Sequence, residues 1–88
     1  MCTTISETTS VGGAGKGPDG WFPLGTMTVG FDHATHTGAE HALLLDFANY
    51  DLGTGARVAV ELDLASGRAL VAQLQATIAA AEASGLPD

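Results

Sequence analysis

Cysteine, positive charge and aromatic side chains are all scarce in this 88-residue sequence. Its single cysteine, Cys2, cannot form an internal disulfide, which is typical of a protein of the reducing cytoplasm. Ten acidic residues against three basic ones give a formal net charge of −7. The chain therefore lacks the cationic surface that attracts nucleic acids and anionic lipids, and we do not expect nucleic acid as a partner.

Long apolar runs are also missing. No stretch approaches the roughly 20 apolar residues that cross a bilayer, and the segment Met1-Cys2-Thr3-Thr4 lacks the basic end and apolar centre of a signal peptide. We therefore expect a cytoplasmic protein that does not bind a membrane. The composition, 45% hydrophobic and 15% charged, is that of a folded chain. Residues 1–88 are expected to form a single domain with a limited pocket.

Four segments have the composition or the alternation of strands. Residues 3–11 are rich in threonine and β-branched side chains. Residues 25–33 and 41–47 each place apolar residues on one side with a period of two, and residues 57–63 separate valine and leucine from charged residues in the same way. The glycine-rich residues 12–20 lack the spacing of a phosphate-binding loop and are expected to be a turn-rich connector. Trp21, which follows them, is expected in the core.

The last quarter of the chain has the periodicity of one amphipathic helix. Apolar residues recur at helical spacing, at Leu70, Val71, Leu74, Ile78 and Ala81. Asp63 or Ser66 is expected to cap its start, and Gly85 followed by Pro87 to end it. The order ββββα predicts an α+β fold in which a four-stranded antiparallel sheet is covered on one face by the C-terminal helix. The alanine-rich remainder of the helix predicts contact with a second copy in a homodimer.

All three histidines of the sequence lie within nine residues, at His33, His36 and His41. By strand alternation, His33 and His41 each continue an apolar face. If the two runs pair as an antiparallel hairpin through residues 34–40, both imidazoles reach its open end and His36 lies on the connecting loop. The three rings are then expected to converge.

This convergence predicts a mononuclear transition-metal site. His33 and His36 have H-x2-H spacing, His41 adds a third nitrogen, and Cys2, Glu40 or Asp32 is the candidate fourth ligand. Three imidazoles suit zinc, copper, nickel or iron. Removal of Met1 would make Cys2 the amino terminus and a two-atom N,S chelate. In an enzyme the metal would act as a Lewis acid or water activator, with Glu40 as the proton-transfer group.

Two alternatives stay open at this point. One is an isomerase or cyclase without a cofactor, in which a His/Glu pair performs acid–base chemistry on a small molecule in a pocket under Trp21 and Phe31. The other is a structural or interaction domain without a site, in which His33 and His41 cap the hairpin and His36 is exposed. The sequence does not decide whether the protein is an enzyme.

Several blocks of the sequence resemble a family of short actinobacterial proteins classified as a domain of unknown function. They are the Met1-Cys2-Thr3 start, Lys16-Gly17-Pro18-Asp19-Gly20-Trp21-Phe22-Pro23, Phe31-Asp32-His33 with His36, Glu40-His41-Ala42-Leu43 through Asp46-Phe47, and Arg57-Val58-Ala59-Val60-Glu61-Leu62. The resemblance covers nearly the whole chain but transfers no activity. It implies a free-standing domain from a high-GC soil bacterium with a link to specialised metabolism. It also groups Cys2 with the three histidines in one pattern.

Overall fold

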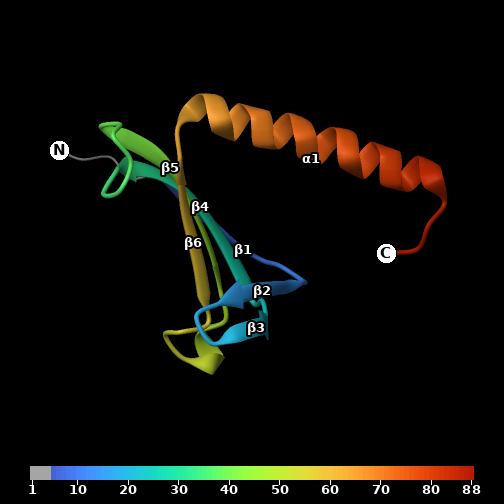
Figure 1. Cartoon of the computed structure of the whole chain (residues 1–88), viewed down its shortest axis with the longest axis horizontal. Coiled ribbons are helices and arrows are strands. Elements are labelled where there is room, and N and C mark those ends of the chain that lie inside the picture. The colour runs from blue at the N-terminus through green and yellow to red at the C-terminus, as the bar shows by residue number, and fades with distance from the viewer. Residues whose placement is uncertain (1–4) are drawn as a thin grey trace.

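The computed structural model describes residues 5–88 and shows an α+β fold (Figure 1). Its elements are β1 (Ile5–Ser10), β2 (Ala14–Gly17), β3 (Gly20–Pro23), β4 (Thr26–His33), β5 (His41–Ala48), the 3₁₀ helix η1 (Tyr50–Leu52), β6 (Arg57–Leu62) and α1 (Leu64–Ser84). Four strands form one sheet in the order β1-β4-β5-β6, with all neighbours antiparallel. The expected four-stranded antiparallel sheet and C-terminal helix are therefore confirmed.

The register of the sheet separates an apolar face from a polar face. Val29 lies opposite Leu45, and Leu45 lies opposite Val60, so these side chains share one side. The apolar face carries Met27, Val29, Phe31, Leu43, Leu45, Phe47, Val58, Val60 and Leu62. At its β1 edge the same side carries Ile5, Glu7 and Thr9, opposite Phe31, Val29 and Met27. The polar face carries Ser6, Thr8, Thr28, Asp32, Asp46, Arg57 and Glu61. Two neighbouring threonines on it, Thr8 and Thr28, are joined by a hydrogen bond of 2.9 Å between their hydroxyls.

A second, two-stranded sheet occupies part of the segment that we expected to be a connector. β2 pairs antiparallel with β3, and Gly17 opposite Gly20 leaves Pro18 and Asp19 as the tight turn. Gly20 has a φ of 115°, which glycine adopts without strain. The expectation of a connector over residues 12–20 was wrong there, because the glycines and the single lysine have low strand propensity and hide the pairing.

The large rings of β3 point in different directions. Trp21 is 72% exposed, so its expected place in the core was wrong for a single chain. Phe22 is partly buried beside the glycines of β2, where a Cβ added at Gly17 would lie 3.1 Å from its ring. These glycines therefore leave room for Phe22.

Local signals set the ends of α1. The Asp63 carboxylate accepts a hydrogen bond of 2.7 Å from the Ser66 N–H, which makes Asp63 the N-cap and lowers the pKa of its carboxyl. Gly85 ends the helix in the left-handed conformation with a φ of 71°. No helix among residues 5–88 combines the length and apolar character needed to span a bilayer.

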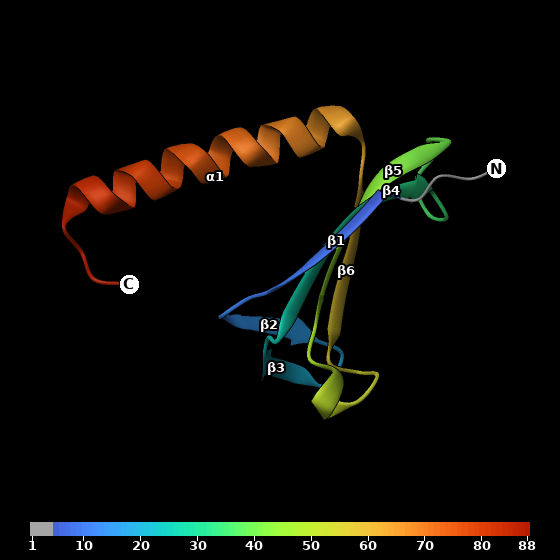
Figure 2. The ribbon, with the colours of Figure 1, turned by 180° about the vertical axis from the view of Figure 1, so that it is seen from behind.

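α1 contacts the sheet only near its start. Gly67 is buried beside Leu43, whose side chain a Cβ at Gly67 would overlap. From Val71 onward every residue is exposed. Figures 1 and 2 show the helix standing out from the end of the sheet at a steep angle. In the described chain, the buried apolar residues are just Ala42, Ala48 and Ala56.

Candidate functional site

His33 and His41 form a cross-strand pair at the end of the β4–β5 ladder. They are direct register partners, and their ring centroids are 4.6 Å apart with 30° between the planes. The next residues along, Ala34 and Glu40, share a hydrogen bond of 3.1 Å from N–H to C=O. The histidines therefore occupy a non-hydrogen-bonded position, where opposite side chains come closest. Both residues are exposed, so solvent and ions reach them.

Phe31 supports one ring of this pair. Its ring stacks on His41 at a centroid distance of 5.6 Å and an interplanar angle of 19°. Stacking of this kind restricts the χ angles of the imidazole. The Asp32 carboxylate accepts the His33 backbone N–H at 2.7 Å, which fixes the backbone beside the pair. The histidine pair is thus held at both residues.

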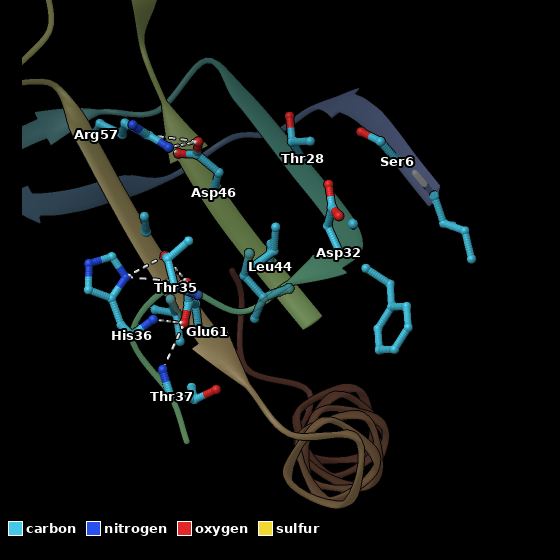
Figure 3. Close-up of a pocket in the computed structure, with 16 residues that line it drawn as sticks. Ser6, Thr28, Asp32, Thr35, His36, Thr37, Leu44, Asp46, Arg57 and Glu61 are labelled. Atoms are coloured by element: carbon cyan, nitrogen blue, oxygen red, sulfur yellow. Dashed lines mark hydrogen bonds and ion pairs between the residues drawn. The ribbon is translucent and has the colours of Figure 1, made fainter. Parts of the chain in front are cut away.

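His36 is held elsewhere, by a carboxylate on the polar face. Glu61 of β6 accepts backbone N–H bonds from Thr35, His36 and Thr37 at 3.2, 2.9 and 3.1 Å. It also accepts the Thr35 hydroxyl at 2.7 Å, and the Nδ1 of His36 lies 3.3 Å from its Oε2. Figure 3 shows this cluster at the end of β6. The Glu61 side chain therefore holds the loop that joins β4 to β5 by hydrogen bonds to residues 35–37.

The hydrogen bonds around Glu61 define its charge and the tautomer of His36. The Thr35 hydroxyl lowers the pKa of Glu61 most, the backbone N–H groups of His36 and Thr35 add to the effect, and the pKa falls from 4.5 to about 2. Since the Thr35 hydroxyl donates to Glu61, its oxygen accepts from the Nδ1–H of His36 at 2.8 Å. Neutral His36 therefore presents an unprotonated Nε2.

A shallow hollow of about 710 Å³ lies over the polar face beside this cluster. The Arg57 guanidinium forms a short ion pair with Asp46 in it, with Nη2 2.7 Å from Oδ2 (Figure 3). The hydrogen bond and charge of Asp46 raise the pKa of Arg57. Thr28 and Asp32 line the same hollow from β4. The imidazole of His36 is the group that can exchange protons with a ligand in this hollow. Because the pKa of Glu61 is low, its carboxylate is a weak base, and its role is to orient the imidazole.

The structure therefore pairs two of the three histidines and directs the third to Glu61. His33 and His41 extend the apolar face, while His36 lines the hollow of the polar face. Among residues 5–88 no three His, Cys, Asp or Glu side chains gather in a metal-binding arrangement. Cys2 lies outside the described residues. Glu40 is exposed at the end of the loop, and Asp46 forms an ion pair with Arg57.

Glu61 is the site residue that the sequence analysis missed. The strict alternation of residues 57–63 indicates a solvent-facing glutamate. Its partners come from residues 24–26 positions earlier in the chain, and no local pattern predicts that distance. The available signal was the Thr35-His36-Thr37 run, because short polar side chains around a tight loop often need an acceptor.

Comparison with known families gives one finding about the whole chain. The sequence pattern of DUF6295, a family of unknown function, matches residues 1–87. The comparisons with curated proteins and with solved structures gave no match.

Proposed function

Since the chain belongs to the DUF6295 family of unknown function, we propose a function from its geometry: it binds one transition-metal ion through His33 and His41. The observation that carries the proposal is their placement as direct cross-strand partners with ring centroids 4.6 Å apart. Imidazole nitrogens bind zinc, copper and nickel at about 2.0–2.1 Å. Small χ adjustments bring one nitrogen of each ring to a shared ion.

Two protein nitrogens leave coordination positions for other ligands. Cys2 and Glu40 are the candidates, with water completing the shell. His36 is the weakest member of the expected ligand set, because Thr35 and Glu61 already engage its Nδ1 and it lines the opposite face of the sheet. We therefore propose a pair-based site rather than a three-histidine site.

An open coordination position is also what catalysis by a metal ion requires. When bound, the ion supplies Lewis-acid chemistry, and Glu40 is the residue of the loop that would move a proton nearby. The acid–base alternative without a metal would use His36, oriented by Glu61, rather than Glu40. Its pocket would be the hollow of the polar face and not a space under Trp21.

The test is titration of tag-free protein with Zn²⁺, Cu²⁺ and Ni²⁺ by calorimetry and by thermal unfolding. We expect one ion per pair and a rise in the unfolding free energy of about 2.7 kcal/mol at a free metal concentration of 100 times Kd. His33→Ala and His41→Ala should each weaken binding by at least about 10-fold, since the loss of a partner even outside the coordination shell costs that much.

His36→Ala is the matched control, because it removes an imidazole from the same loop. It should leave the affinity unchanged under the pair proposal and weaken it in a three-histidine site. Unaltered melting temperatures with all three ions would refute metal binding altogether. An intact-mass measurement and Cys2→Ser test whether the terminal thiol adds a ligand.

A further inference from the structure

Many large apolar side chains of the described chain are exposed, and the buried apolar residues are all alanines. Val29 and Val60 of the apolar face are each 39% exposed, although both lie beside Leu45. Glu7 of β1 lies on the other side of Val29, at the edge of this face. Leu74 and Ile78 of α1 are 51% and 56% exposed. Contiguous apolar surface of this kind on a folded domain indicates an interface.

The solvent-accessible surface of the chain is larger than that of a compact monomer of the same mass. The chain exposes 6558 Å², whereas a compact monomer of 8.9 kDa exposes about 4,800 Å². The excess is about 1,700 Å² per chain, and obligate homodimers bury about 2,000–5,000 Å² over both chains. The radius of gyration, 14.9 Å, also exceeds the roughly 12 Å of a compact domain of this length. Burial of the apolar sheet face and of α1 against a second chain would account for the excess surface, and the projecting α1 for the large radius.

The apolar stripe of α1 faces the side on which the sheet lies. Gly67, Leu70, Val71, Leu74, Ile78 and Ala81 follow one another at helical spacing. Gly67 lies against Leu43 of the apolar face, and Figure 2 shows the helix leaving the sheet after its first turns. By helical spacing, the rest of the stripe lies on the same side of α1 as Gly67, toward the angle between helix and sheet. In this 21-residue helix, Arg68 and Glu82 are the charged residues. A helix that stayed in solvent would carry far more charge.

We propose that the occupant of this angle is α1 of a second copy, so that two chains exchange helices across a two-fold axis. Each chain offers both halves of the contact, an apolar sheet face and an apolar helix stripe, which is what an isologous interface needs. The helix is about 31 Å long and β4 about 27 Å, so one helix spans the partner's sheet. Little charge opposes the contact, because Glu7, on the edge strand β1, is the one charged residue that the β-strand register places on the apolar sheet face.

This proposal is independent of the metal site and has its own test. Sedimentation equilibrium of tag-free protein without added metal should give twice the chain mass of 8.9 kDa. In a sample mixed from ¹³C-labelled and unlabelled chains, filtered NOE spectra should connect the methyls of Leu74 and Ile78 to those of Val29 and Val60 across chains. A stable folded monomer, or a dimer without these contacts, would overturn the proposal.

A matched pair of lysine substitutions locates the interface. Ile78→Lys places a charge in the stripe and should raise the dimer dissociation constant at least 100-fold. Ala76→Lys adds the same charge on the opposite side of α1 and should leave the dimer intact. If Ile78→Lys unfolds the chain, circular dichroism will show it, and the NOE measurement on the unmodified protein still decides.

Discussion

Glu61 shows how much one side chain organises at the residue scale. It collects three backbone N–H groups and a hydroxyl from a single loop. Amide donors that converge on an ionised carboxylate make strong hydrogen bonds, and each would need another acceptor if Glu61 were removed. The conformation of the loop that carries His36 therefore depends on the charge of a strand residue.

The contribution of Glu61 to the stability of the loop decreases as the pH falls. The pKa of Glu61 is lowered from 4.5 to about 2, so the ionised form favours the folded loop above about pH 4.5. This contribution is lost as the pH falls through about 2. The ¹³C carboxyl resonance of Glu61 should titrate near pH 2, together with the amide resonances of residues 35–37.

Two substitutions check the assignment. Glu61→Gln should abolish this titration and reduce the hydrogen-exchange protection of residues 35–37 at neutral pH. Glu40→Gln removes a carboxylate from the end of the same loop and should leave both unchanged. A midpoint near 4.5 in the unmodified protein would contradict the hydrogen-bond network.

At the scale of elements, Gly67 sets how α1 meets the sheet. Glycine is a poor helix former, by about 1 kcal/mol relative to alanine. Its place inside α1 therefore needs a reason from packing. That reason is Leu43, since a Cβ at Gly67 would overlap its side chain. The close approach packs the start of α1 against β5.

Gly67→Ala should therefore lower stability despite the better helix propensity. Overpacking costs roughly 1–3 kcal/mol and the propensity gain offsets about 1 kcal/mol, which leaves a loss of up to about 2 kcal/mol in chemical denaturation. In a Leu43→Ala background the clash is gone, and the same substitution should become stabilising. Stabilisation by Gly67→Ala alone would show that the two elements do not pack as described.

At the scale of the whole molecule, the proposed dimer would supply the core that one described chain lacks. The buried apolar residues of the described chain are Ala42, Ala48 and Ala56, and three small side chains contribute little burial free energy. In the proposed dimer, the partner's helix buries the larger side chains of the apolar face. Folding and dimerisation are then one process.

Such coupling makes the melting temperature a function of protein concentration. Dilution of the unmodified protein over a 100-fold range should lower the melting temperature continuously, as followed by circular dichroism. Ala76→Lys should show the same slope. A melting temperature that is constant across the range would indicate that one chain is stable on its own.

Local and periodic features of the sequence determined the elements of this protein. Threonine-rich, β-branched composition indicated β1, and period-two alternation indicated β4, β5 and β6 and their faces. Helical spacing indicated α1, and Asp63 and Gly85 marked its ends. The pairing of His33 with His41 follows from the same alternation and from a hairpin between neighbouring strands. These features depend on residues that are close in sequence or on strands that follow one another, so a single sequence is enough to predict them.

Only the tertiary structure decided the direction of each loop and helix. It turned His36 away from the other histidines toward Glu61, paired Arg57 with Asp46, and sent α1 away from the sheet after Gly67. Each outcome depends on contacts between residues distant in sequence, where hydrogen-bond geometry and steric overlap compete in three dimensions. Periodicity records which side chains are apolar, but it does not record which surface will cover them.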